Sequence, residues 1–137
     1  MYIYSVDKHK LNSVDNVDFK LEKDIQDLCE SNINTLFGLN IITSEFTLSN
    51  LRMDTFAYDS VAKSFVIMEY KKDRNFSVID QGYAYLSSVL NNKADCILAY
   101  NETHKTPLKR DSIDWTQTRI IFYCSFIYSI PNTIYQF

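Results

Sequence analysis

Residues 51–58, LRMDTFAY, and residues 64–71, SFVIMEYK, are two strand-forming segments separated by the short polar break 59–63. Aromatic and β-branched side chains are frequent in both segments, and the run FVIM at 65–68 is apolar without interruption. A short polar break between two such runs favours an antiparallel hairpin. We therefore predict two adjacent strands, of which the second is buried.

Side chains that can carry out chemistry stand at the end of this hairpin. Alternate side chains share one face of a strand, so Glu69 and Lys71 project to the same side and Tyr70 projects away. If the two strands pair, Asp54 on the first strand reaches the same end. Two carboxylates and an ammonium group are then expected together where a buried strand meets solvent.

A divalent cation would relieve the repulsion between Asp54 and Glu69. Mg²⁺ prefers hard oxygen ligands and keeps several waters, so these two carboxylates and the backbone carbonyl of Tyr70 would suffice as protein ligands. Such a cation lowers the pKa of a bound water and stabilises charge on phosphorus, while Lys71 can orient that water or neutralise the phosphate. The residues point to phosphodiester hydrolysis, although Asp followed by Glu-x-Lys is a weak pattern when taken alone.

The remaining segments complete a small α/β (α+β) domain. Apolar positions recur at helical spacing over residues 19–36, with Asp18 as a candidate cap and Gly38 where a helix commonly stops. Residues 77–80, SVID, are typical of a capping box that opens a second helix. Further elements are expected: strands at 1–6, 39–48 and 119–124, a helical or mixed piece at 94–100, and a loop at 103–117. This order predicts a mixed central sheet flanked by helices.

The composition is that of one compact domain, residues 1–137. Hydrophobic residues make up 46% and charged residues 23%, which is enough to fill a core. Only two glycines argue against a glycine-rich phosphate loop. The well-separated Cys29, Cys96 and Cys124 favour a reducing, cytoplasmic setting over a disulfide framework. The most apolar stretch, 120–130, is too short to span a bilayer, so we expect no membrane association.

Charge is unevenly distributed along the chain. The net charge of −3 argues weakly against non-specific binding of nucleic acid, because phosphate contacts usually come with an excess of Lys and Arg. Two small basic clusters stand out from the negative net charge of the chain. They are Lys71, Lys72 and Arg74, and Lys105, Lys109 and Arg110. For each cluster alone, a solvated charged face is the favoured interpretation.

Two pairs of polar residues at helical spacing strengthen the nuclease hypothesis. Glu22 and Gln26 lie one turn apart beside the apolar stripe of the first helix. Both can therefore face inward toward the end of the hairpin where Asp54 and Glu69 are expected to bind metal. Gln81 and Tyr85 repeat that spacing on the helix that follows Lys71.

Taken together, these motifs resemble those of the PD-(D/E)xK nucleases. The resemblance is carried by Arg52-Met-Asp54, by the strand 65–71 and by Gln81-Gly-Tyr-Ala-Tyr85, which is similar to the Gln-xxx-Tyr motif of the RecB-like branch. Residues 19–121 are also similar to the amino-terminal domain of proteins that carry a DUF5655 domain, some of which are labelled predicted transport proteins.

This resemblance implies a restriction-endonuclease-like fold and a Mg²⁺ or Mn²⁺ ion. It implies Asp54 and Glu69 as metal ligands, Lys71 as the catalytic lysine and Glu22 as a supporting acid. The expected activity is that of a Mg²⁺-dependent endonuclease acting on DNA.

The same resemblance suggests how nucleic acid would be held. Gln81 and Tyr85 would shape the site or contact nucleic acid, and the neighbouring Lys72 and Arg74 are further candidate substrate contacts. A homodimer is an additional expectation.

The sequence departs from the family pattern in two places. Met53 stands where the family has a proline, which leaves the chemistry unaffected. The chain ends at Phe137 without the second domain that such proteins carry, so we interpret it as a domain shortened at its C-terminus.

Two other functions stay open on these residues. A nuclease-like module that binds nucleic acid or a protein without cutting agrees with the acidic charge, whereas the intact acid, acid, lysine set favours the enzyme. A component of a transport system rests on a label alone and ranks last. No second His or Cys stands near His9 or His104 at ligand spacing, so zinc is not expected.

Overall fold

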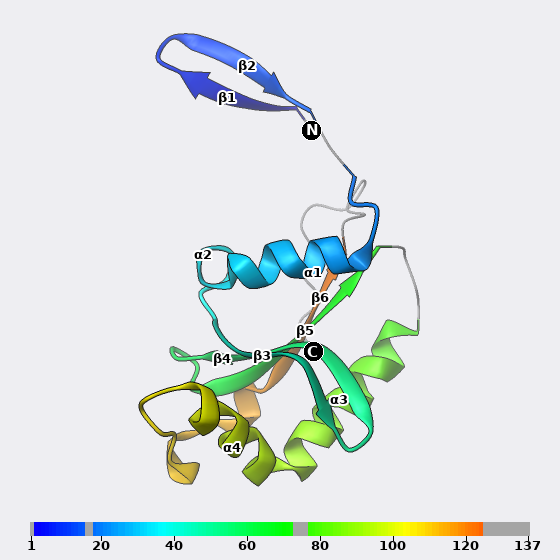
Figure 1. Ribbon diagram of the computed structural model, residues 1–137, viewed down its shortest axis with the longest axis vertical. Helices are drawn as coiled ribbons and strands as arrows, with labels where there is room; N and C mark the ends of the chain where they lie inside the picture. The colour runs from blue at the N-terminus through cyan, green and yellow to red at the C-terminus, as the bar shows by residue number, and fades with distance from the viewer. Residues whose placement is uncertain (1, 16–17, 73–76, 125–137) are drawn as a thin grey trace.

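The computed structural model of the protein describes residues 2–15, 18–72 and 77–124. Its centre is a four-stranded mixed sheet with the strand order β3-β4-β5-β6 (Figure 1). The strands are β3 (Asn40–Leu48), β4 (Leu51–Asp59), β5 (Ser64–Lys71) and β6 (Arg119–Cys124). The first three pair antiparallel, and β6 lies parallel to β5. The expected α/β class with a mixed central sheet is confirmed, and all four strands lie within one residue of their predicted bounds.

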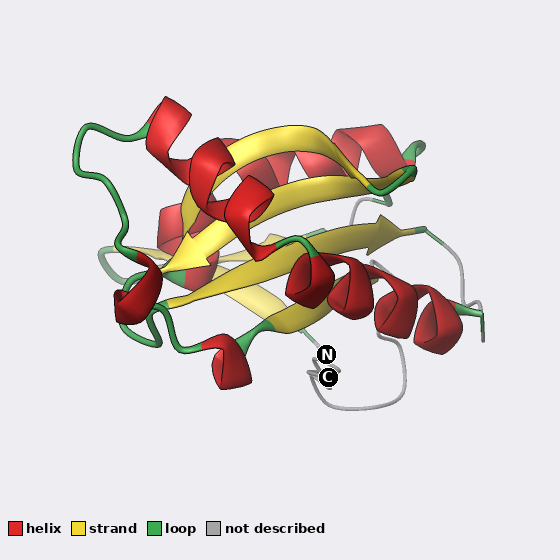
Figure 2. Ribbon diagram, turned by 90° about the horizontal axis from the view of Figure 1, so that it is seen from below, coloured by secondary structure: helices red, strands yellow, loops and turns green. Residues whose placement is uncertain are grey.

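Helices cover both faces of this sheet (Figure 2). On one face lie α1 (Glu22–Ser31) and α2 (Ile33–Phe37), and on the other lie α3 (Val78–Asn91) and α4 (Lys93–Thr103). The side chains of β5 alternate between the two layers, with Val66, Met68 and Tyr70 on the α1 side and Phe65 and Ile67 on the α3 side. Burial on both faces explains why the sequence of β5 is an uninterrupted apolar run.

The long first helix predicted from periodicity is two helices. α1 ends at Ser31 and α2 begins at Ile33, with Asn32 between them outside helical geometry. Asp18 is not the cap of α1, which begins after Leu21, and the carboxylate of Asp24 accepts the Leu21 N–H at 3.2 Å. Gly38 ends α2 with φ 66°, as predicted, because glycine adopts this left-handed conformation without strain.

The parallel β5–β6 pair requires a long crossover, because a hairpin cannot join parallel strands. α3 and α4 supply that crossover. A Cβ added to Gly82 of α3 would lie 3.2 Å from the ring of Phe122 on β6, so the absent side chain allows a close approach of helix to strand. This approach positions the segment of α3 that carries Gln81 and Tyr85.

The termini of the crossover differ in detail from the sequence expectations. Ser77 is the residue before α3, as predicted, but its side chain makes no capping hydrogen bond, so the predicted capping box is wrong. α4 is longer than the predicted segment 94–100. The predicted loop at 103–117 contains two 3-10 turns, η1 (Arg110–Ser112) and η2 (Trp115–Gln117). It lies over one end of the sheet, where the N–H of Asp114 donates to the Lys63 carbonyl at 2.8 Å.

The predicted strand at 1–6 is one half of a hairpin. β1 (Ile3–Asp7) pairs antiparallel with β2 (Lys10–Val14), and every residue of both strands is exposed. Figure 1 shows this hairpin standing off the remainder of the molecule. Within the described residues, no helix has the length and apolarity needed to cross a membrane.

Candidate functional site

The candidate site lies where β4 and β5 separate. Their backbone pairing runs from Asp59↔Ser64 to Thr55↔Met68 and ends there. β4 continues beside β3 as far as Leu51, while β5 continues beside β6 as far as Lys71. Figure 1 shows the β3–β4 hairpin curling away from β5 and β6 at this point. The sheet therefore opens at the position where Asp54 faces Glu69.

Side chains replace the backbone ladder across this opening. The N–H of Asp54 donates to Glu69 Oε1 at 2.8 Å, and the N–H of Tyr70 donates to Asp54 Oδ2 at 3.1 Å. Each carboxylate thus accepts a hydrogen bond from the backbone of the opposite strand. The two acids that the sequence predicted at one edge are brought together, and they satisfy the backbone N–H groups of Asp54 and Tyr70.

Burial and like charge dominate the electrostatics of this pair. Glu69 is only 2% exposed, and Asp54 is half-buried. Burial, followed by the negative charge of Asp54, raises the pKa of Glu69 far above its ordinary value of about 4.5, and the nearby charge of Lys71 opposes the shift. None of the ion pairs formed within the described residues includes Asp54 or Glu69. The excess negative charge of the pair therefore has no cation in direct contact among those residues.

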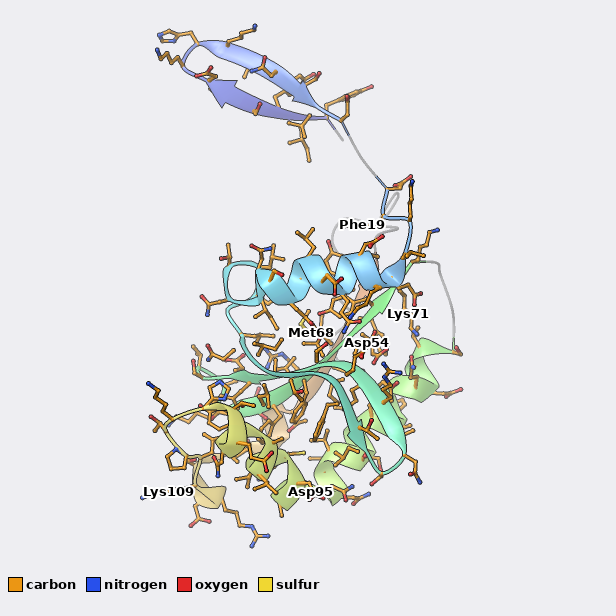
Figure 3. The ribbon with its side chains drawn as sticks, viewed as in Figure 1. Phe19, Asp54, Met68, Lys71, Asp95 and Lys109 are labelled. Carbon is orange, nitrogen blue, oxygen red and sulfur yellow. The ribbon has the colours of Figure 1, made fainter. Side chains whose placement is uncertain are left out.

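Lys71 is the third residue predicted at this edge, after Asp54 and Glu69, and it lies at the end of β5. It is half-buried and projects from the last residue of the strand. Figure 3 shows Asp54 and Lys71 at the same edge of the sheet, beneath the first turns of α1, with Asp95 and Lys109 at the far side of the molecule. The side chain of Tyr70 points to the opposite layer, as strand alternation predicted.

Glu22 approaches the same edge from α1 but does not join the carboxylate pair. Its Oε1 accepts the backbone N–H of Lys72 at 3.0 Å, just beyond the end of β5. The described residues contain no group of three His, Cys, Asp or Glu side chains suited to hold a metal ion. A pair of carboxylates fits Mg²⁺ nonetheless, because this ion is usually bound by one or two carboxylates and retains several waters.

Gln81 and Tyr85 connect α3 to the strand that carries Asp54. Gln81 Nε2 donates to the Tyr85 hydroxyl at 3.0 Å, and that hydroxyl donates to the carbonyl of Arg52 at 2.8 Å. Burial raises the pKa of Tyr85 to about 12, and the charge of the nearby Glu69 adds to the increase. The buried hydroxyl is thus committed to the protein, so Tyr85 supports the site rather than presenting a free group to a substrate.

A polar network on the opposite face was only partly foreseen. Gln26, expected to face inward beside Glu22, is buried and donates to the carbonyl oxygen of Asp54 at 3.0 Å. Thr55 donates to the carboxylate of Glu30 at 2.6 Å and also hydrogen-bonds the Tyr70 hydroxyl at 2.9 Å. Thr55 and Glu30 carry no motif, and they could be found only by knowing which helix packs on which face of β4.

The remaining candidate residues are the proposed substrate contacts. Arg74 lies outside the described residues. Lys72 is half-buried next to Glu22, and its contact with a substrate stays a prediction. The Tyr70 carbonyl as a metal ligand also stays a prediction, although the peptide N–H of the same residue is held by Asp54.

Comparison with known proteins adds a relative but no activity. The chain is 48% identical over 122 residues to an uncharacterized protein of Haemophilus influenzae. The match covers 89% of this chain and 40% of that protein, so the chain spans less than half the length of its relative. No family model and no solved structure matches the chain. Function must therefore be argued from the site itself.

Proposed function

We propose that this chain is a metal-dependent nuclease domain that hydrolyses phosphodiester bonds, with DNA as its substrate. The observation that carries the proposal is the pairing of Asp54 with Glu69 at the opening between β4 and β5, beside Lys71. We take the fold to be restriction-endonuclease-like and the setting to be the reducing cytoplasm.

Asp54 and Glu69 would hold one Mg²⁺ or Mn²⁺ ion. Both side chains offer hard oxygen atoms, and burial together with the negative charge of Asp54 raises the pKa of Glu69, so a bound cation would favour the ionised pair. Reciprocal hydrogen bonds from the backbone already hold the two carboxylates in place, so little ordering would be needed when a cation arrives. When bound, such a cation activates water and stabilises the negative charge that develops on the phosphate.

The chain's own residues would divide the remaining work. Lys71 shares a strand face with Glu69, so its ammonium group can neutralise a phosphate oxygen beside the carboxylates. Tyr85 and Gln81 keep the β4 backbone in position from the α3 side. Lys72 and Arg74 would contact the nucleic-acid backbone, and their positive charge would partly offset the net charge of −3.

The alternative is a nuclease-like module that binds a partner without cutting. The net charge of −3 favours it, because an acidic domain repels nucleic acid unless cations or a partner intervene. The pairing of half-buried Asp54 with buried Glu69 favours the enzyme, because a carboxylate pair without a ligand destabilises the fold and a purely structural module has no need of it.

The proposal is tested by metal binding and cleavage measured on the same proteins. Mg²⁺ and Mn²⁺ are titrated calorimetrically into the parent chain, Glu69→Ala and Lys71→Met, and each protein is then incubated with plasmid, linear and single-stranded DNA. The matched control is Lys109→Met, which removes an exposed lysine at the far side of the molecule. Cleavage products are separated on gels with and without a chelator.

We expect the parent and Lys109→Met to bind metal and to cut DNA. Glu69→Ala should lose both properties, whereas Lys71→Met should keep metal binding and lose cleavage by about 100-fold or more. Metal binding without cleavage of any DNA would favour the non-catalytic module. A parent chain that binds neither ion would refute the metal site.

A further inference from the structure

We propose that Gln26 is a positioning residue that holds the Asp54 peptide and thereby sets the Asp54 carboxylate against Glu69. The inference rests on the proposed function for its catalytic meaning, but its structural part can be tested without metal. Gln26 lies on α1, on the opposite side of the sheet from Tyr85 and α3.

Side chains hold both polar backbone groups of Asp54, which belong to the peptide groups on either side of its Cα. Its N–H donates to the Glu69 carboxylate, and its carbonyl oxygen accepts from Gln26 Nε2 at 3.0 Å. β3 is irregular at the same level, since Glu45, which lies opposite Asp54 between the pairs Ser44↔Thr55 and Phe46↔Met53, has φ 55°. A non-glycine residue in this left-handed region is strained and interrupts regular pairing. Asp54 therefore depends on Gln26 and Glu69 where a regular ladder would otherwise hold it.

The amide of Gln26 has a single orientation. Its Nε2 lies 3.0 Å from Glu30 Oε1, 3.1 Å from Ser44 Oγ and 3.0 Å from the Asp54 carbonyl. A carboxylate and a carbonyl can only accept, so the nitrogen and not the oxygen of the amide must face them. Two hydrogens serve three acceptors, which means that at least one hydrogen is shared. At 4% exposure, Gln26 has little competition from water.

Glu30 is held in turn by a hydrogen-bonded chain. Thr55 Oγ1 donates to Glu30 Oε1, so the hydroxyl of Tyr70 must donate to Thr55. The network thus begins and ends on residues next to the site, because Thr55 follows Asp54 and Tyr70 follows Glu69. Residues that hold a metal ligand through such a contact typically change metal affinity by about 10- to 100-fold when they are removed.

Two substitutions separate positioning from folding. Gln26→Met keeps the length of the side chain and removes its donor, and Thr55→Val interrupts the network one step further away. The matched control is Ser88→Ala, because Ser88 is also buried and also donates to a backbone carbonyl, that of Leu48 beside the β3–β4 turn, and this hydrogen bond involves neither Asp54 nor Glu69. Ser88→Ala removes one hydrogen bond, whereas Thr55→Val removes two and Gln26→Met removes contacts with three acceptors, so each variant is judged by its Asp54 and Tyr70 amides relative to control amides of the same protein.

The first readout is hydrogen exchange of individual backbone amides, measured by NMR in a buffer that contains a chelator. Gln26→Met should accelerate exchange of the Asp54 and Tyr70 amides by about 10-fold or more beyond the change at control amides in β5, and Thr55→Val should do so less. In Ser88→Ala, the exchange rates of the Asp54 and Tyr70 amides relative to the control amides should stay unchanged. The second readout is calorimetric titration of Mn²⁺. Its dissociation constant should rise by about 10-fold in Gln26→Met and by modestly less in Thr55→Val. It should not change in Ser88→Ala.

The two readouts fail independently. If the parent binds no Mn²⁺ but the exchange pattern appears, Gln26 positions Asp54 and the metal-dependent nuclease is wrong. If Gln26→Met destabilises the protein as Ser88→Ala does, with unchanged relative exchange at Asp54 and Tyr70, the positioning role is refuted whatever the metal result.

Discussion

Asp54 and Glu69 face each other across two strands that no longer pair, and each carboxylate accepts a backbone N–H from the other strand. The distances are 2.8 Å from Asp54 N to Glu69 Oε1 and 3.1 Å from Tyr70 N to Asp54 Oδ2. This arrangement satisfies two backbone N–H groups but places two acids side by side, and one of them, Glu69, is buried. The consequences for stability, metal binding and pH dependence follow from that relationship.

Stability without metal should fall as the pH rises. The folded protein raises the pKa of Glu69 through burial and the charge of Asp54, so the folded state binds a proton that the unfolded state has released. The resulting stability is fully present below the ordinary pKa of about 4.5 and is lost as the pH rises through the higher folded value. Urea denaturation in a chelator at about pH 5 and about pH 8 measures the difference.

Glu69→Gln should remove this pH dependence. Glutamine keeps an oxygen that can accept from the Asp54 N–H but carries no charge, so the variant should be more stable than the parent by about 1 to 3 kcal/mol at about pH 8. At about pH 5 the difference should shrink. A variant less stable than the parent at both pH values would show that the carboxylate is not under strain in the folded protein.

Mg²⁺ or Mn²⁺ should stabilise the parent chain. A ligand that binds only the folded state at about 100 times its dissociation constant raises the free energy of unfolding by about 2.7 kcal/mol. Thermal unfolding with and without metal measures this shift in the parent and in Asp54→Asn, which should show none. Asp95→Asn, which alters an exposed acid far from the site, should respond to metal like the parent.

Tyr85→Phe should weaken the site from the α3 side. The substitution leaves the Arg52 carbonyl and the Gln81 amide without the hydroxyl that joins them, so we expect a loss of about 1 kcal/mol in the free energy of unfolding. Metal affinity should fall as well, because β4 is less well held beside Asp54. Tyr4→Phe, in the exposed N-terminal hairpin, serves as the comparison and should alter neither quantity.

Asp59→Asn should destabilise the fold without affecting metal. Burial raises the pKa of Asp59, but hydrogen bonds from the Ala62 N–H and from Arg119 outweigh it, so the net shift is downward. That stability is present above the ordinary pKa and is lost as the pH falls through the lower folded value. At neutral pH the variant leaves the half-buried Arg119 without its charged hydrogen-bond acceptor, a loss of about 2 kcal/mol. Denaturation and metal titration of the same variant should therefore separate the two ends of the sheet, and a loss of metal affinity would contradict this separation.

Local sequence accounts for the strands of the central sheet and for the identity of the two acids, whereas β2 of the N-terminal hairpin was not predicted. The hairpin 51–71 could be predicted because strand propensity and a polar turn act over short distances. The α/β order followed from the same kind of pattern. Helix ends were less predictable, since Asn32 interrupts a stretch whose apolar spacing continues across the break from α1 to α2.

The sequence by itself determined that Asp54, Glu69 and Lys71 share one edge, because a period of two residues and a hairpin register are local properties of the chain. The tertiary structure decided how they are held. Separation of β4 from β5 exposes the Asp54 and Tyr70 N–H groups to the opposing carboxylates, and packing of α1 on the sheet brings Gln26 to the Asp54 carbonyl. Those contacts join residues 15 to 28 positions apart, and only the packing of whole elements brings residues so distant in sequence together.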